Sequence, residues 1–309
     1  MDTWPRAPAL ACKHCGVTAA RPSVVAHRGA SAVEPEHTLA AYRHAIEVGA
    51  DALECDVRLT ADGHLVCVHD RKVDRTSNGR GLVSTLELTQ LEGLDWGSWK
   101  RISEGAGPED VEPDVVEFGD RAHLLTLKRL LSLVADSSTS GRQVEIAVET
   151  KHPTRYGGLV ERTLLEVLDH FGWARPGRPG PVRVMSFSLL AVRRMRQLAP
   201  SVPLVFLMER VPLPFRDGSL PRGVGSAGIA VEVLRAHPSY VERVHARGGQ
   251  VHVYTVDEPD DVQRCLDAGV DVIITNRPGQ VLHQVGRSPG RTARAAGGGG
   301  HTGPGAGPP

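Results

Sequence analysis

The chain has 309 residues, a formal net charge of zero at pH 7, and charged side chains at 23% of its positions. A chain of this length can bury a full core, either as one large α/β domain or as two smaller domains. The balanced charge argues against a general binder of nucleic acid or anionic membranes, because such proteins usually carry a basic excess. No apolar run is long enough to cross a bilayer, so we expect no stable membrane insertion.

The two ends of the chain differ in composition from its middle. The first residues lack the basic start and the apolar stretch of a secretion signal. The five cysteines are too few and too irregularly spaced for a disulfide framework. Together these two observations predict a cytoplasmic protein. Cys12, His14 and Cys15 form one Cys-x-x-Cys pair, but a zinc site needs four ligands, and we interpret residues 1–21 as a disordered leader. The Gly/Pro-rich stretch 287–309 predicts a disordered tail. The folded domain is then expected over residues 22–286.

Eight short apolar runs within that domain predict β-strands. Both faces of each run are apolar, as is typical of strands covered on both sides. They cover residues 23–27, 52–57, 144–150, 182–187, 203–208, 228–233, 250–256 and 270–275. Stretches with helical periodicity lie between most of them, and several end at glycine. Parallel strands joined by right-handed crossovers close most simply as an α/β (β/α)₈ TIM barrel, with an open doubly wound sheet as the alternative.

A ninth apolar run, residues 64–70, does not fit this alternation. Only the four residues "TADG" separate it from the second predicted strand. Parallel neighbours need a dozen or more connecting residues, whereas an antiparallel hairpin needs very few. We therefore expect a small insertion after the second strand, over about residues 58–122, which begins with a hairpin and has an acidic loop in its middle.

Charged side chains follow the apolar runs of the first three predicted strands. They are His27 and Arg28, then Glu54 and Asp56, then Glu149 and Lys151. In a TIM barrel the carboxyl ends of the strands form the active face. The last two pairs have a spacing of two, so both members of each pair point to the same side of the strand. The sequence therefore predicts a polar site at one rim of the barrel.

The three carboxylates in this set indicate a metal site. Glu54, Asp56 and Glu149 would repel one another at close range unless they were protonated or neutralised. Ligands that are all oxygen atoms suit a hard cation, so we expect one divalent cation, Mg²⁺ or Ca²⁺. The alternative is a structural ion network with Arg28 and Lys151.

Two histidines and two basic residues complete the predicted chemistry. His27 and His69 are candidates for a general acid and a general base, because histidine titrates near neutral pH. Arg28 and Lys151 provide fixed positive charge and donor hydrogens suited to a phosphate. This set of groups fits hydrolysis of a phosphodiester, whose negative charge must be screened and whose leaving alkoxide must be protonated.

The segments "AHRGAS", "EPEHTLAAYRHAIEVGAD", "LECDVRLTADGHLVCVHD", "VDRTSNGRG", "VETK", "MSF" and "GVDVIITNRP" resemble the glycerophosphodiester phosphodiesterase family, over nearly all of residues 24–278. The resemblance implies a TIM barrel with a small insertion, and hydrolysis of small glycerophosphodiesters to glycerol 3-phosphate and an alcohol. Position by position, it assigns His27 and His69 as the acid/base pair and Arg28 and Lys151 as phosphate contacts. It places Glu36 near the site. It assigns Glu54, Asp56 and Glu149 as metal ligands.

Two positions depart from the usual pattern of that family. His37 stands where the family usually has asparagine, and it can keep a hydrogen-bonding role. Tyr254 stands where tryptophan is usual, which leaves the head-group preference open. Ser186, Phe187 and Asn276 either line the pocket or serve packing and capping roles.

Two other functions remain open at this stage. One is hydrolysis of lysophospholipids by a lysophospholipase D-type reaction, which the acidic insertion and the lack of an anchor disfavour. The other is a catalytically silent protein that binds a phosphate ligand, although every charged residue named above is present. The sequence also leaves open the oligomeric state, the leaving alcohol, which histidine is the acid, and whether water or a substrate hydroxyl attacks.

Overall fold

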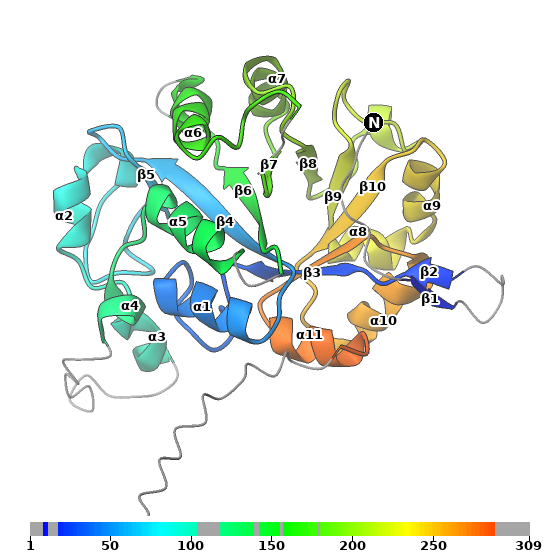
Figure 1. The fold of residues 1–309 in the computed structure, drawn as a ribbon, viewed down its shortest axis with the longest axis horizontal. Coiled ribbons are helices and arrows are strands. Elements are labelled where there is room, and N and C mark those ends of the chain that lie inside the picture. Colours follow the sequence, from blue (N-terminus) through cyan, green and yellow to red (C-terminus); the bar gives the residue numbers. More distant parts are fainter. Residues whose placement is uncertain are drawn as a thin grey trace, which may run out of the picture.

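The computed structural model describes residues 9–11, 18–103, 118–138, 142–154, 157–177 and 180–287. Eight parallel strands form a closed barrel, because the first strand, β3, pairs with both β11 and β4 (Figure 1). In order around the barrel they are β3 (Ser23–His27), β4 (Ala52–Leu59), β6 (Glu145–Thr150), β7 (Val182–Ser186), β8 (Leu204–Met208), β9 (Ser226–Ala230), β10 (Gln250–Tyr254) and β11 (Val272–Thr275). The predicted (β/α)₈ TIM barrel is therefore confirmed, and the open sheet is excluded.

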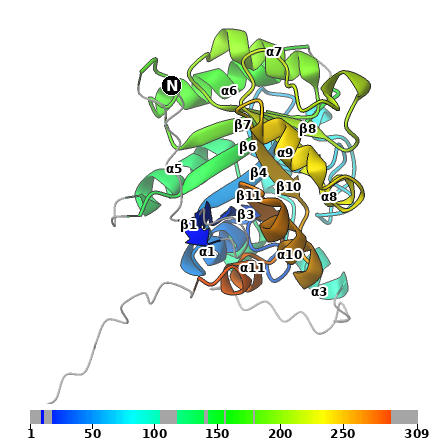
Figure 2. The same cartoon turned by 90° about the vertical axis from the view of Figure 1, so that its right-hand side faces the viewer.

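Helices surround the barrel on its outside (Figure 2). They are α1 (Leu39–Glu47), α5 (Leu127–Ser137), α6 (Leu159–His170), α7 (Leu189–Leu198), α8 (Val231–Ala236), α9 (Ser239–His245), α10 (Pro259–Ala268) and α11 (Pro278–Gln284), and the 3₁₀ turn η2 (Leu213–Phe215) lies between β8 and β9. Thr38, Thr126 and Ser188 begin α1, α5 and α7, and each side-chain oxygen accepts a hydrogen bond from a backbone N–H of the first turn. This pattern is the preferred N-cap arrangement.

The strands alternate between two apolar layers, because successive side chains point to opposite faces of a strand. The outward-facing side chains, such as Leu53 and Val148, pack against the helices in the large core. The inward-facing side chains form a second cluster that fills the barrel interior: Val25, Ala52, Ala147, Met185, Val205, Leu207, Val272 and Ile274. The interior is therefore packed below the rim, and the functional groups are confined to one end.

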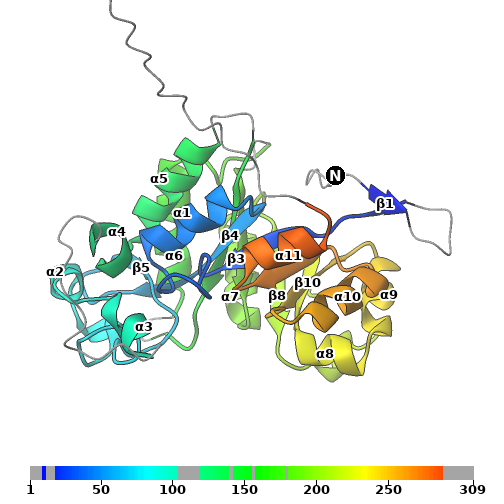
Figure 3. The same ribbon diagram turned by 90° about the horizontal axis from the view of Figure 1, so that it is seen from below.

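The insertion begins with β5 (Leu65–Cys67), which pairs antiparallel with β4 and confirms the predicted hairpin. It continues through η1 (Val83–Thr85), α2 (Leu88–Glu92), α3 (Ser98–Ser103) and α4 (Phe118–Ala122). These elements lie together on one side of the barrel, away from α8, α9 and α10 (Figure 3). A separate small core holds them: Val66, Val68, Val73, Val83, Leu91, Trp96 and Leu124. Most of the expected acidic loop, residues 104–117, lies outside the described residues.

Several strand boundaries differ from the prediction, and two of these differences have a clear structural cause. The run 228–233 was expected to be a strand, but β9 covers Ser226–Ala230 and helix α8 begins at Val231. An uninterrupted short apolar run cannot distinguish a buried strand from the start of a buried helix. The second strand, β4, extends to Leu59 rather than ending near Val57, because its last three residues pair with β5.

The N-terminal segment contains two short strands where the sequence predicted no packed structure. β1 (Ala9–Ala11) and β2 (Thr18–Ala20) pair with each other antiparallel. The Cys12–Cys15 pair lies outside the described residues. Within the described ranges, no helix combines the length and the apolar character needed to cross a membrane.

An ionic cluster closes the amino-terminal end of the barrel. Arg183 on β7 is only 3% exposed, and its guanidinium donates to Nε2 of His252 at 2.9 Å and to Glu145 at 3.3 Å. Burial raises the pKa of Glu145 to about 7, although the positive charge of Arg183 opposes that shift. Because this end lies opposite the rim that carries catalytic groups in TIM barrels, we interpret the cluster as structural.

Replacing Arg183 with methionine should lower the free energy of unfolding by about 3 kcal/mol, because it leaves buried polar partners without a donor. The matched control is Arg193→Met, at an exposed position on α7, where a change within about 0.5 kcal/mol is expected. Chemical denaturation of both variants measures the difference. A cost for Arg183→Met no larger than that of the control would contradict the structural role.

Candidate active site

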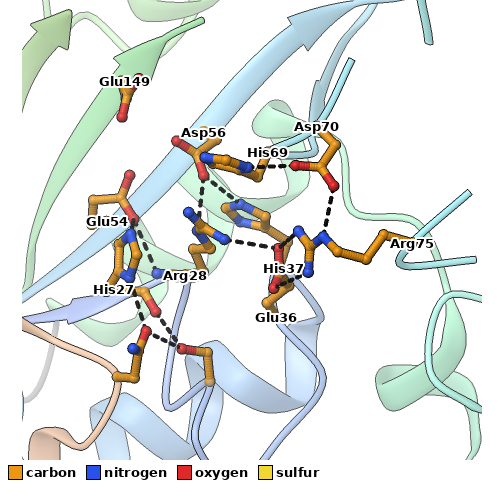
Figure 4. Close-up of polar contacts among 12 residues, drawn as sticks. His27, Arg28, Glu36, His37, Glu54, Asp56, His69, Asp70, Arg75 and Glu149 are labelled. Carbon is orange, nitrogen blue, oxygen red and sulfur yellow. Dashed lines mark hydrogen bonds and ion pairs between the residues drawn. The ribbon is translucent and has the colours of Figure 1, made fainter. Parts of the chain in front are cut away.

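Three buried carboxylates converge at the carboxyl-terminal rim of the barrel. Asp56 on β4 is the direct register partner of Glu149 on β6, and Glu54 lies two residues earlier on the same face of β4. One oxygen from each carboxylate lies within 4.8 Å of an oxygen of the other two. Figure 4 shows the three groups facing a common space. The register of two parallel strands therefore produces a cluster of ligand atoms that could hold a metal ion.

The carboxylates in this cluster do not share one protonation state. Burial raises the pKa of Glu149 to about 8 and the pKa of Glu54 well above its usual range, and the negative charge of Asp56 adds to both shifts. Burial opposes ionisation of Asp56 as well, but Lys151, His37 and Arg28 overcome it and hold its pKa well below the usual range. Asp56 is thus the ionised member around which the positive groups are arranged.

Two basic residues contact the cluster directly. Lys151 Nζ lies 2.9 Å from Asp56 Oδ1 and 2.7 Å from Glu149 Oε1. Arg28 Nε lies 3.1 Å from Asp56 Oδ2, and the backbone N–H of Arg28 donates to Glu54 Oε2 at 3.0 Å. Lys151 therefore bridges two carboxylates with its ammonium group, whereas Arg28 contacts one with its guanidinium and another with its backbone N–H. Both side chains are held at the rim rather than extended into solvent.

The backbone around this cluster is unusual at two positions. Arg28 and His37 have φ values of 57° and 62°, which are uncommon for residues other than glycine. The carbonyl of Arg28 accepts from the backbone N–H of His37 at 3.1 Å, so the two positions stabilise each other. Both side chains contact Asp56. Backbone strain of this kind often occurs at functional sites, where the surrounding structure maintains it.

His37, the departure from the family pattern, is fully committed inside the structure. Its Nδ1 lies 2.8 Å from the hydroxyl of Tyr42, and its Nε2 lies 3.0 Å from Asp56 Oδ2. The Tyr42 hydroxyl donates to the backbone carbonyl of Glu54 at 3.0 Å. Since that hydroxyl has a single hydrogen, it must accept from the His37 ring. His37 therefore connects Tyr42 of helix α1 to the carboxylate of Asp56, and Tyr42 in turn contacts the backbone of Glu54. His37 keeps a hydrogen-bonding role, as expected.

The two candidate acid/base histidines lie at different sides of the carboxylates (Figure 4). His27 Nε2 faces the cluster, 3.9 Å from Glu54 Oε2. Burial and the charge of Arg28 lower the pKa of His27 to about 4. His27 also lines an open pocket of about 380 Å³, together with Ser31, Glu36, Asn276 and others. A neutral imidazole is thus placed between the carboxylates and a pocket that opens to solvent.

His69 belongs to the insertion and is held by three contacts. Its Nδ1 lies 2.6 Å from Asp70 Oδ1, and Arg58 donates to its backbone carbonyl from Nε at 2.8 Å and from Nη2 at 2.6 Å. Burial lowers the pKa of His69, although Asp56 and Asp70 oppose that shift. Arg58 lies on β4, and His69 follows β5, the strand that pairs with β4 in the hairpin. The hairpin therefore brings Arg58 and His69 together.

Arg75 connects the insertion to the barrel. It donates to Asp70 Oδ2 at 2.6 Å and forms two hydrogen bonds to Glu36, at 2.9 and 2.8 Å. Glu36 in turn accepts from Arg28 at 3.1 Å. Burial would raise the pKa of Glu36, but hydrogen bonding to Arg75 and the charge of Arg28 lower it to about 2. A continuous chain of polar contacts thus runs from His69 through Asp70, Arg75 and Glu36 to Arg28, whose guanidinium lies beside Asp56.

Every site residue predicted from the sequence lies in this one region. His27, Arg28 and Glu36 are on the first strand and the loop that follows it, and His69 comes from the insertion. Five supporting residues were not predicted from the sequence: Tyr42, Arg58, Asp70, Arg75 and Asp257, the last of which accepts a hydrogen bond from Asn276. Asp70 directly follows His69, so the pair itself was a usable signal. Arg75 and Asp257 act across loops, and no spacing in the sequence marks them.

A closed barrel with its titratable groups at the carboxyl ends of the strands is the arrangement of TIM-barrel enzymes. The chain belongs to the Glycerophosphoryl diester phosphodiesterase family, whose model matches residues 27–280. It is 48% identical over 266 residues to the "Probable glycerophosphodiester phosphodiesterase 1" of Mycobacterium tuberculosis, covering 85% of this chain and 92% of that protein. It is 34% identical to the glycerophosphodiester phosphodiesterase of Bacillus subtilis, covering 84% and 85% of the two chains.

Solved structures support the same fold. A phosphodiesterase from Oleispira antarctica, in complex with the product sn-glycerol-3-phosphate, superposes with a TM-score of 0.72 at 22% identity, covering 85% of this chain and 96% of that chain. A glycerophosphodiester phosphodiesterase from Agrobacterium tumefaciens gives a TM-score of 0.66 at 23% identity, covering 85% and 99% of the two chains. These likenesses establish the barrel architecture.

The low pKa of Glu36 predicts a specific pH dependence of stability. A carboxylate whose pKa is lowered by folding stabilises the folded state above its unfolded pKa, near 4.5, and that contribution is lost as the pH falls toward 2. Glu36→Gln should therefore reduce the free energy of unfolding by about 2 to 3 kcal/mol at pH 7 and by less than half of that near pH 3.

Urea denaturation at both pH values measures this effect. The control is Glu47→Gln, at the exposed last residue of helix α1, for which a change below about 0.5 kcal/mol is expected. A cost for Glu36→Gln that stays constant between pH 7 and pH 3 would show that its carboxylate is not selectively stabilised in the folded protein.

Proposed function

We propose that this protein is a metal-dependent glycerophosphodiester phosphodiesterase that releases glycerol 3-phosphate and an alcohol. The observation that carries the proposal is the convergence of Glu54, Asp56 and Glu149 beside two basic residues and His27. The names of the relatives, and the product bound in the Oleispira antarctica structure, point to the same substrate class.

The donor atoms fit a hard divalent cation. Among the described residues, the buried Oε1 of Glu54 has no hydrogen-bond partner, and the three carboxylates together provide only oxygen ligands. Glu54, Asp56 and Glu149 would hold Mg²⁺ or Ca²⁺. When bound, the ion would screen the charge of the phosphate and stabilise the charge that develops in the transition state. The unpartnered Oε1 of Glu54 distinguishes this arrangement from a structural ion network in which every carboxylate oxygen is paired.

The residues of the chain supply the remaining functions. Arg28 and Lys151 lie beside the carboxylates with donor hydrogens that suit phosphate oxygens. Glu36 orients Arg28 through its hydrogen bond at 3.1 Å. His27 and His69 transfer the protons, one from the attacking hydroxyl group and one to the departing alcohol. Asp70 and Arg58 hold the ring and the backbone of His69 in place.

Purified protein should hydrolyse glycerophosphocholine in the presence of Mg²⁺ or Ca²⁺, and chelation should abolish turnover. Glu149→Gln and Asp56→Asn should each lower kcat/KM by at least about 100-fold, because the ion loses a charged ligand. The control Glu166→Gln, at an exposed position on α6, should retain wild-type activity. Coupled detection of glycerol 3-phosphate gives the rates.

No turnover across several head groups and divalent ions would contradict the proposal and favour a catalytically silent binder of phosphate ligands. Full activity of Glu149→Gln and Asp56→Asn would support the phosphodiesterase reaction but contradict the role of these carboxylates as metal ligands.

Binding of the cation should release protons at pH 7. Glu149, with a pKa of about 8, is protonated before the ion binds and must ionise to serve as a ligand. Burial shifts the pKa of Glu54 in the same direction. Titration calorimetry with Mg²⁺ or Ca²⁺ in buffers of different ionisation enthalpy should therefore show release of at least about one proton per ion. The released number should decrease as the pH rises above 8, and Glu149→Gln should release fewer protons than the wild type. Binding without proton release would contradict this interpretation.

One observation supports a second substrate class, the lysophospholipids. Phe187 is 43% exposed and lies beside Lys151 and Tyr254, while Leu190 on α7 and Leu213 on η2 are 59% and 75% exposed. These apolar side chains follow β7 and β8 and thus lie toward the rim of the barrel. A kcat/KM for lysophosphatidylcholine that exceeds the value for glycerophosphocholine would place this activity first. A lower value would keep the small glycerophosphodiester as the substrate.

A further inference from the structure

The edge of the His27 ring that faces away from the carboxylates is hydrogen-bonded to Asn276. Its Nδ1 lies 2.8 Å from Oδ1 of Asn276, which follows the last strand, β11, whereas its Nε2 faces Glu54. Ser31 Oγ also lies 2.8 Å from Asn276 Oδ1. The contact therefore joins the two strands, β3 and β11, at which the barrel closes.

The orientation of the Asn276 amide is determined by Asp257. The Asn276 side-chain Nδ2 donates to Asp257 Oδ2 at 2.6 Å, and Asp257 Oδ1 accepts from the Asn276 backbone N–H and from the Thr275 hydroxyl, both at 2.8 Å. A carboxylate with three donors around it can only accept. The NH₂ group of Asn276 must therefore face Asp257, and its carbonyl oxygen must face His27.

This orientation determines which nitrogen of His27 carries the proton. An amide oxygen accepts hydrogen bonds and cannot donate, so Nδ1 of His27 must be the protonated nitrogen. In the neutral ring, Nε2 then has a free lone pair directed toward the carboxylates. We propose that Asp257 and Asn276 are positioning residues that hold His27 as the Nδ1–H tautomer, so that Nε2 is the general base of the reaction. This inference rests on the function proposed above.

The environment of His69 fits the complementary role. Its Nδ1 faces the carboxylate of Asp70, which favours the positively charged ring against the effect of burial, whereas His27 faces a neutral amide. In the reaction, His27 Nε2 takes a proton from the attacking water, or from a glycerol hydroxyl whose cyclic phosphate product is then opened by water, as the new P–O bond forms. The bond from phosphorus to the leaving oxygen breaks, and that oxygen receives the proton of His69 Nε2. The two rings then return to their starting states by proton exchange with solvent.

Asp257→Asn tests the proposal with little change in shape. In this variant the new amide oxygen would keep the two hydrogen bonds of Asp257 Oδ1, and its NH₂ group would require an acceptor. Asn276 would satisfy it by turning its amide, which would present an NH₂ group to His27 Nδ1 and favour the Nε2–H tautomer. NMR of ¹⁵N-histidine-labelled protein with Mg²⁺, with the signal assigned by loss in His27→Gln, should show Nδ1–H in the wild type and Nε2–H in Asp257→Asn.

Kinetics with two leaving groups provide the second measurement. Glycerophosphocholine needs a protonated leaving group, whereas glyceryl p-nitrophenyl phosphate does not, and both need a deprotonated nucleophile. Asp257→Asn should lower kcat by at least about 100-fold on both substrates, with KM changed by less than about 3-fold. Asp70→Asn should lower kcat mainly on glycerophosphocholine. The control Asp260→Asn, at an exposed position in the first turn of α10, should match the wild type.

The double variant Asp257→Asn with Asn276→Asp separates tautomer control from a merely structural effect. In this variant the amide at position 257 donates to the carboxylate at position 276, which also accepts from His27 Nδ1. The double variant should therefore recover kcat to at least about a tenth of the wild-type value. The proposal would be overturned by any one of three results: an Nε2–H tautomer of His27 in the wild type, a wild-type kcat in Asp257→Asn, or a decrease of kcat in Asp257→Asn that is confined to glycerophosphocholine. If the wild type hydrolyses neither substrate, the proposed function fails, and the NMR signal still decides the tautomer.

Discussion

The register between β4 and β6 is the constraint on which the site depends. It places Asp56 directly beside Glu149, with Glu54 on the same face, in a buried part of the barrel. A shift of one residue would turn these side chains toward the helix layer, because neighbouring residues of a strand face opposite sides. Burying three carboxylates together is unfavourable unless they are protonated, paired or bound to a cation. The remainder of the rim can be understood as a response to that cost.

The compensation comes from several parts of the chain. Arg28 and Lys151 place positive charge against Asp56, and the backbone adopts uncommon φ values at Arg28 and His37 to allow it. The insertion contributes Arg75, which joins Asp70 to Glu36. The insertion therefore contributes to the candidate active site as well as adding to the barrel. Its separate small core explains how it can hold His69 at a defined position.

The parts of the fold that could be predicted were those with a regular pattern. Eight apolar runs, the hairpin after "TADG" and pairs of acidic residues at a spacing of two all follow from strand geometry. The same reasoning misplaced the strand at 228–233, since an apolar run that continues into α8 has no periodic break at Val231. It also ended β4 too early, because β5 pairs with residues beyond the barrel.

The roles of supporting residues could not be derived from sequence for a different reason. Asn276 was a candidate for the pocket, but the contact of its amide with His27 depends on closure of the barrel between β11 and β3. Asp257 and Tyr42 act through hydrogen bonds whose direction is visible only once their partners are placed. Such contacts join residues that are distant in the chain, and neither composition nor periodicity reports them.

The most direct test of the central claim is a crystal structure of the protein with Mn²⁺ in place of Mg²⁺ or Ca²⁺, examined by anomalous diffraction. We expect one strong peak at the rim, with an oxygen of Glu54, of Asp56 and of Glu149 each at about 2.0 to 2.6 Å from it. A peak that contacts fewer than two of these carboxylates, in a crystal of active enzyme, would contradict it.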